Sequence, residues 1–426
     1  MIWFVLIHSI LLAGICFSQD VPEDKKCPFC KTTGRLSNPF YEKYMNSLDL
    51  DKILFSSWVI ENDPKGLGLP WYPCERCRNE TLKAQAEAEF ERLAAARQRW
   101  LAQRREIDKK LQAQEPLLHL ETEHFLWTWD IPELTYNKRK YRSHEALNLY
   151  AMRIEGFYND FKREHKITDE DLQQANKVTD GDLSTKKFNL FCFERELIAR
   201  KACPLYGKQA SPSGRVTLQG VPSVSVKWWD KTRMPTEDYL YRDMVHSVAH
   251  LLVAVYHSPW WLFESGFAYE GLAHWWELYY SDKATSTCIR EINILTDWVA
   301  SKWEQKVKKA VLAGKCPSLV SLLGKNGGSL SAKEHIFSWS IMDYMMFLDK
   351  RKTLDFCVIL KQNRPAREAF YEVWGASILN FEAQWREYVK QEYKVLIGNN
   401  IVSTRRTRSK MRGALVSEEE EEEKEE

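Results

Sequence analysis

The order of the predicted elements places this chain in the α+β class. β-rich segments come first, at residues 123–131, 187–193 and 216–229, with one amphipathic helix at residues 143–166 among them. From residue 235 to about residue 393 the pattern is helical. Strands followed by a run of helices are typical of an α+β domain. We therefore expect a small mixed sheet followed by a mainly helical half.

Each of these elements has its own signal. Residues 123–131 (EHFLWTWDI) are rich in the aromatic residues that favour strands. Gly and Pro punctuate residues 216–229, which indicates one or two strands there. The helix at residues 143–166 is predicted from apolar residues that recur at helical spacing. These are Leu147, Tyr150, Ile154 and Tyr158.

The composition fits a folded chain of one large domain or two ordinary ones. The chain has 426 residues, of which 44% are hydrophobic, and its 17 Trp are enough to fill a sizeable core. Its 61 Lys and Arg almost balance 59 Asp and Glu, so the charge indicates neither nucleic acid nor an anionic membrane as partner. A basic run followed by almost pure Glu predicts a disordered tail at residues 396–426.

The first eighteen residues predict export. They form an apolar stretch of signal-peptide length that is too short to span a membrane comfortably, although no Lys or Arg precedes it. Cys16 lies near a lipoprotein-like box, but the bulky Ile15 favours soluble export. We expect a signal peptide at residues 1–18, a periplasmic or extracellular protein, and no stable membrane insertion after cleavage.

Two CxxC units predict a cysteine-rich head at residues 19–80. Thiolates at i and i+3 can hold two corners of a zinc tetrahedron, and a second unit completes it. The intervening residues 31–73 are longer than a usual zinc-ribbon spacing, so an insertion must loop out. In an exported protein two disulfides are the alternative. The predicted structural zinc ligands, or disulfide partners, are Cys27, Cys30, Cys74 and Cys77.

Two further segments follow this head. Residues 81–115 are crowded with Ala, Glu, Arg, Gln and Leu, and residues 81–114 contain no Gly or Pro, which predicts a long, exposed, charged helix or linker. A shift in composition near Pro116 marks the expected start of the large domain, residues 116–395.

The large domain contains a pattern that indicates a metal site. His246 and His250 lie one turn apart on a predicted helix, so both side chains can reach one ion. Glu270 follows twenty residues later, a gap that suits a second helix packed against the first. Two His and one Glu leave the fourth zinc position open, which is the arrangement of a catalytic zinc.

These residues resemble those of a known family. His246-x-x-x-His250 followed by Glu270-Gly-Leu-Ala-x-Trp is similar to the gluzincin zinc metallopeptidases, in particular the peptidase MA-like bacterial proteins, over residues 118–393. The resemblance implies a zincin-like fold, Zn²⁺ as cofactor, and the ligand set His246, His250 and Glu270. Glu264 is the alternative third ligand, because its Trp-Leu-Phe-Glu-Ser-Gly context partly matches the same family segment.

The chain departs from that family at one decisive position. The residue after the first His is Glu in the family, where it acts as the general base on zinc-bound water. Here it is Ser247, and a hydroxyl is too weak a base to replace a carboxylate. We therefore expect an impaired enzyme, a pseudo-peptidase. Alternatives are an active zinc hydrolase with a displaced base, such as Glu264 or Glu277, and a scaffold protein that binds an unknown protein or peptide.

Other polar residues lie near the motif in the sequence. Asp243, one turn before His246, is a candidate for orienting that imidazole, but a helix N-terminal acid is the simpler interpretation. His257 and His274 are close enough in sequence to touch the site, yet each is interpreted as an ordinary histidine among aromatic neighbours.

Overall fold

The computed structural model describes most of the chain between residues 27 and 393. The described ranges are 27–31, 33–41, 53–63, 67–173, 187–207, 213–218, 221–232, 234–257, 265–281, 283–284 and 300–393. The expected signal peptide, the expected tail and Glu264 lie outside them.

The described residues form a mixed α+β structure, as the sequence predicts. They divide into two compact units, and helix α5 (Ser143–His165) contributes to both. The first unit comprises Met1–Gly156 and Thr179–Ala202, and the second comprises Phe157–Val178 and Cys203–Glu426. The boundary expected near residue 116 therefore lies inside the first unit.

Strands β2 (Ile53–Ser56), β4 (Leu118–Thr122), β5 (Phe125–Trp129) and β8 (Phe188–Phe193) lie side by side in that order in the first unit. β4 is antiparallel to β2 and β5, whereas β5 and β8 are parallel. Every residue of β5 and β8 is buried, as expected for strands covered on both faces. The sequence did not indicate β2, which brings part of the predicted head into this sheet.

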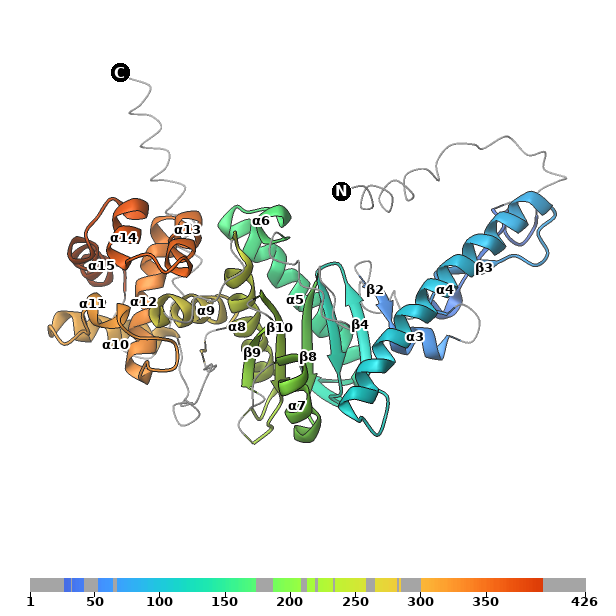
Figure 1. The fold of residues 1–426 in the computed structure, drawn as a ribbon, viewed down its shortest axis with the longest axis horizontal. Coiled ribbons are helices and arrows are strands. Elements are labelled where there is room, and N and C mark those ends of the chain that lie inside the picture. Colours follow the sequence, from blue (N-terminus) through green and yellow to red (C-terminus); the bar gives the residue numbers. More distant parts are fainter. Residues whose placement is uncertain are drawn as a thin grey trace, which may run out of the picture. The chain divides into compact units, whose positions relative to one another are not determined.

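Helix α4 (Glu80–Leu111) is the longest element of the first unit and runs from the strands of the sheet to the cysteine-rich end (Figure 1). Asn79 caps its first turn by accepting a hydrogen bond from the Leu82 amide. The expectation of a fully exposed helix is wrong near its C-terminus, where Ile107 and Leu111 are buried. There Asp108 also binds the buried His119 of β4, with 2.8 Å between Oδ1 and Nε2.

Shorter elements complete the first unit. Their bounds are β1 (Arg35–Ser37), α3 (Ser57–Asn62), β3 (Trp71–Pro73), β6 (Glu133–Tyr136), β7 (Arg139–Arg142) and α7 (Glu196–Ala202). β1 pairs with β3, and β6 pairs with β7 as a hairpin.

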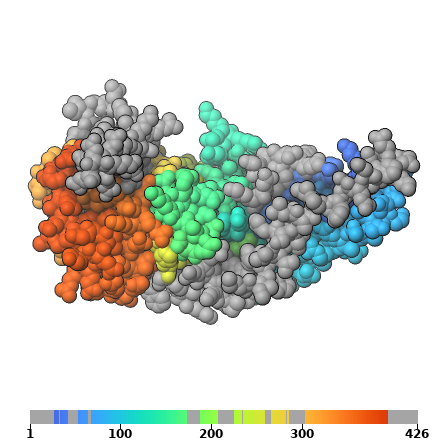
Figure 2. Space-filling model, turned by 90° about the horizontal axis from the view of Figure 1, so that it is seen from above, coloured from blue at the N-terminus to red at the C-terminus, as the bar shows by residue number. Residues whose placement is uncertain are grey.

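The second unit is mainly helical. Before its long helices come α6 (Asp169–Gln173), the π-helix η2 (Cys203–Gly207) and the antiparallel strands β9 (Ser213–Leu218) and β10 (Val221–Trp228). The helices that follow are α8 (Glu237–Val255), α9 (Gly266–Tyr280), α10 (Ala300–Leu312), α11 (Leu319–Leu323), α12 (Ala332–Leu348), α13 (Lys350–Lys361), α14 (Ala366–Trp374) and α15 (Ile378–Glu392). The C-terminal helices of this unit, which are coloured orange to red, form one continuous block in the space-filling view (Figure 2).

Helix α9 is the centre of this unit, because both α8 and α12 pack against it (Figure 1). Gly271 allows the close approach of α12: a Cβ atom there would lie 2.5 Å from the Ser338 carbonyl oxygen. Lys361 of α13 holds the end of α8, since its Nζ donates to the carbonyls of Val253 and Tyr256 at 2.8 and 2.7 Å. Among the described residues, no helix is both long and apolar enough to cross a membrane.

The close approach at Gly271 leads to a stability prediction. We expect Gly271→Ala to lower the free energy of unfolding by about 1–3 kcal/mol, because the added methyl group meets backbone atoms that cannot rotate away. Gly156→Ala is the matched control, since it also lies inside a helix and a Cβ there meets no atom within 4 Å. It should be neutral or stabilising by up to about 1 kcal/mol. Urea denaturation measures both, and equal effects of the two substitutions would contradict the prediction.

Candidate metal centre

Helix α8 carries the first two candidate ligands, His246 and His250. They lie one turn apart on the same face, as an i, i+4 pair does, and only 1% and 2% of their surfaces are exposed. Their Nε2 atoms are 3.0 Å apart. Tyr269 of α9 packs on the His250 ring, with 3.8 Å between the ring centroids. The pair therefore offers two nitrogen ligands to one point.

Glu270 brings a carboxylate to this point from α9. Its Oε2 lies 3.4 Å from His246 Nε2, and its Oε1 lies 3.9 Å from His250 Nε2. In a tetrahedral zinc site with bonds of roughly 2.0–2.1 Å, neighbouring ligand atoms are about 3.3 Å apart. The three donor atoms lie within 4.8 Å of one another, so they fit a zinc ion held by two imidazoles and one carboxylate.

Glu277, two turns after Glu270 on α9, contacts His246 from the other side of the ring. Its Oε2 lies 3.1 Å from His246 Nδ1. We assign the proton of His246 to Nδ1 from this contact, which leaves the lone pair of Nε2 directed toward the candidate metal position. Carboxylates that accept this proton fix the tautomer and orientation of a metal-binding histidine. Glu277 is therefore placed to position His246.

The same oxygen of Glu277 also contacts a third histidine. It lies 2.7 Å from Nδ1 of His274, whose Nε2 is 2.9 Å from Nδ1 of His335 on α12. His335 Nδ1 in turn lies 3.9 Å from Oε2 of Glu270. The contacts thus close into a ring of six buried residues, the histidine–glutamate cluster: His246, His250, Glu270, His274, Glu277 and His335.

The cluster shifts the ionisation of its members. Burial alone would raise the pKa of Glu277, but the charge and hydrogen bonds of His246 and His274 outweigh it and hold the pKa below its usual range. Burial also lowers the pKa of His274, because the charged imidazolium is poorly solvated. Both directions, toward an ionised carboxylate at Glu277 and a neutral imidazole at His274, are those that metal binding requires.

Ser247 lies on α8 between the two candidate ligands and is 1% exposed. Its hydroxyl cannot act as a useful base near neutral pH. Glu277 is occupied by contacts to His246 and His274, so it lies on the Nδ1 side of His246 and away from the candidate metal position. Asp243 pairs with Lys227 of β10, with 2.7 Å between Oδ2 and Nζ.

Two surface hollows among the described residues lie apart from the cluster. One hollow lies between α12 and α15 and is lined by Tyr344, Phe347 and Tyr388 among others. A second is lined by His257, Asp355 and their neighbours. Neither contains a residue of the cluster, so neither provides a path for substrate to it.

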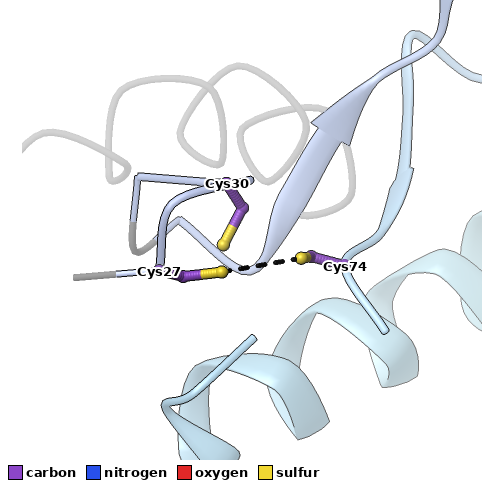
Figure 3. Close-up of side chains that lie close together, drawn as sticks. All are labelled: Cys27, Cys30 and Cys74. Atoms are coloured by element: carbon purple, nitrogen blue, oxygen red, sulfur yellow. Dashed lines mark hydrogen bonds between the residues drawn. The ribbon is translucent and has the colours of Figure 1, made fainter. Parts of the chain in front are cut away.

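The cysteines of the head meet at one end of the first unit. Strands β1 and β3 pair in antiparallel fashion and bring residues 27–30 beside residues 74–77. Figure 3 shows the sulfur atoms of Cys27, Cys30 and Cys74 pointing toward one another, and they lie within 4.8 Å of each other. Cys77 is buried in the same group, where its thiol donates to the Asn79 carbonyl at 3.6 Å.

The sulfur distances in this group fit shared zinc binding. Sγ of Cys27 and Sγ of Cys74 are 4.0 Å apart, close to the edge of about 3.8 Å expected for a tetrahedral zinc–thiolate site with bonds of about 2.3 Å. The structure shows no disulfide bond among these four cysteines. The backbone amide of Cys30 lowers the pKa of Cys27 to about 7, which favours the thiolate that binds metal. Burial instead raises the pKa of Cys74 to about 11.

The structure brings together the predicted residues His246, His250 and Glu270, with Ser247 beside them. It also adds three residues to which sequence reasoning gave no metal-binding role: His274, Glu277 and His335. The spacing of His274 and Glu277, three residues apart on one helix, was a usable signal for a paired contact. His335 carried no such signal, because its place depends on how closely α12 approaches α9 at Gly271.

Comparison with known proteins found no matching family model, no similar curated protein and no similar solved structure.

The double contact of Glu277 leads to a prediction about metal affinity. We expect Glu277→Gln to weaken zinc binding at the cluster by about 10–100-fold, because the amide is a poorer acceptor for the Nδ1 protons of His246 and His274. Competitive titration with a chelator measures the affinity. Glu155→Gln is the matched control: Glu155 is another buried carboxylate that binds a histidine, His124, at 2.7 Å. Equal affinities in both variants would contradict a positioning role for Glu277.

Proposed function

We propose that this chain is an exported, metallopeptidase-like zinc protein of zincin-like fold whose peptidase activity is impaired. One observation carries the proposal: His246, His250 and Glu270 converge from two packed helices with their donor atoms within 4.8 Å. The sequence motif that resembles the gluzincins names the same three residues. The proposed cofactor is Zn²⁺, which imidazole and carboxylate ligands suit.

The zincin-like assignment is supported by the order of the elements. Strands precede the helix with the His pair, and the helix with the third ligand packs directly on it. In the gluzincin pattern the ligand Glu follows on such a second helix. Glu270 lies on α9, the helix that follows α8 among the described residues, which supports the proposal.

The impaired activity is proposed from the groups around the ligands. A zinc-bound water has a pKa of about 7, so a nucleophile can form, but peptide cleavage also needs a group that moves a proton to the leaving nitrogen. A positioned acid–base group contributes about 10²–10⁴ in rate. Ser247 cannot supply it, and Glu277 is engaged by two histidines.

A second zinc ion is proposed in the head. Cys27, Cys30 and Cys74 form a compact sulfur group, and Cys77 lies buried beside them. Four thiolates make a closed coordination sphere with no place for substrate, which is the mark of a structural zinc. This head would then stabilise the β1–β3 pair and the start of α4, and serve as an interaction module for a protein or peptide partner.

The two zinc sites can be separated by substitution. We expect His250→Ala to remove the zinc ion held by His246, His250 and Glu270 while the cysteine-bound zinc remains, and Cys74→Ser to remove the cysteine-bound zinc only. Elemental analysis after dialysis measures both losses. His257→Ala is the control, because His257 is 37% exposed and lies outside the cluster. Unchanged zinc content in His250→Ala would refute the cluster site, and unchanged content in Cys74→Ser would refute the head site.

The replacement at Ser247 predicts that the zinc-loaded protein does not cleave peptides. Activated esters should still be cleaved slowly, because their leaving group needs no proton, and this cleavage should disappear in His250→Ala. A peptide library and an activated ester, each assayed with and without chelator, measure the two activities. Brisk peptide cleavage that both the chelator and His250→Ala abolish would overturn the proposal and would mean that another residue acts as base.

A further inference from the structure

The histidine–glutamate cluster contains more donor atoms than one zinc ion uses. His246, His250 and Glu270 account for the first ion, yet His274 and His335 lie in the same buried ring. Glu270 forms a second compact group with exactly these two histidines, whose donor atoms also lie within 4.8 Å of one another. Glu270 is therefore shared by two sets of three ligands.

We propose that the cluster binds a second divalent metal ion through His274, His335 and Glu270, so that the Glu270 carboxylate bridges two ions. This inference rests on the proposed first site. The second set repeats the composition of the first, with two imidazoles and one carboxylate. Such a set suits a divalent ion of the first transition row, such as Zn²⁺ or Co²⁺.

The distances in the second set resemble those in the first. His274 Nε2 and His335 Nδ1 are 2.9 Å apart, and His335 Nδ1 is 3.9 Å from Glu270 Oε2. The corresponding distances in the first set are 3.0 and 3.4 Å. Oε2 of Glu270 lies near both His246 and His335, whereas Oε1 lies 3.9 Å from His250 Nε2. Oε1 can therefore bind the first ion and Oε2 the second, and bridged ions in two-metal sites lie roughly 3.5–4 Å apart.

Glu277 supports both sets in the same way. Its Oε2 contacts Nδ1 of His246 from the first set and Nδ1 of His274 from the second. Each contact leaves Nε2 of the histidine free of a proton and directed away from Glu277. Because one oxygen, Oε2, contacts the Nδ1 atoms of both histidines, Glu277 acts as the acceptor of hydrogen bonds.

Charge sets the order of binding. One divalent ion balances the two carboxylates of the cluster, Glu270 and Glu277. A second ion adds two positive charges in a buried site, where charge is costly. The second ion is therefore expected to bind more weakly than the first, in a separate step.

Metal counting on the full chain tests the bridge. Equilibrium dialysis of wild-type protein against Zn²⁺, followed by elemental analysis, should give one equivalent for the cysteines and two for the cluster. His335→Ala and His250→Ala should each lose one equivalent, whereas the control His257→Ala should lose none. Retention of both cluster equivalents in His335→Ala would overturn the assignment.

The outcomes separate the two proposals. The second ion is overturned if wild-type protein binds only one zinc equivalent at the cluster, and if that equivalent is lost in His250→Ala but kept in His335→Ala. This result leaves the proposed function intact. No loss in His250→Ala refutes the proposed function itself. If His335→Ala does not fold, wild-type protein loaded with Co²⁺ still decides: two ions bridged by Glu270 give an exchange-coupled paramagnetic resonance signal as the second equivalent is added, and isolated ions do not.

Discussion

The second unit is organised around a carboxylate that cannot reach water. Glu277 has no exposed surface, and a buried ionised group is tolerated only when it is fully paired. Its two partners, His246 and His274, come from α8 and from its own helix α9. This requirement fixes the rotation of α8 about its axis, because any other face would leave Glu277 without His246. The same rotation directs His250 toward Glu270, so the pairing of one acid positions the ligands of the candidate metal site.

Close backbone packing extends this constraint to α12. Gly271 lies on α9 one residue after Glu270, and the space for a Cβ atom there is taken by the Ser338 backbone. Ser338 is three residues after His335 on α12. The close contact between Gly271 and Ser338 therefore also sets the position of His335 along the axis of α9. The polar ring and the tight crossing are therefore coupled: a wider separation of α9 and α12 would move His335 away from His274 and Glu270.

The sequence could predict those parts of the site that depend on residues close together in the chain. The i, i+4 spacing of His246 and His250 gives their common face directly, and the twenty-residue gap from His250 to Glu270 correctly indicated a second helix, α9, packed on the first. The roles of Glu277 and His335 depend instead on the rotation and separation of helices, which no short pattern encodes. Aromatic residues indicated β5, nearby Gly and Pro indicated β10, and the spacing of apolar residues indicated α5, whereas the sequence did not indicate the hairpin of β6 and β7. β2 was not indicated by the sequence. Its four residues pair with β4, from which the whole of α4 separates them in the sequence, and they show no alternation of buried and exposed residues.

The burial of the cluster bears on why Ser247 is tolerated. A working peptidase must admit a peptide and move protons beside its zinc, and both needs favour an exposed, polar site with a free carboxylate. Here the six polar residues are at most 2% exposed, and both carboxylates face histidines. Ser247 is 1% exposed, so a glutamate at this position would add a third carboxylate to the interior, where an ionised group costs more than a serine hydroxyl. The serine thus fits a buried cluster whose surrounding side chains favour metal binding over proton transfer.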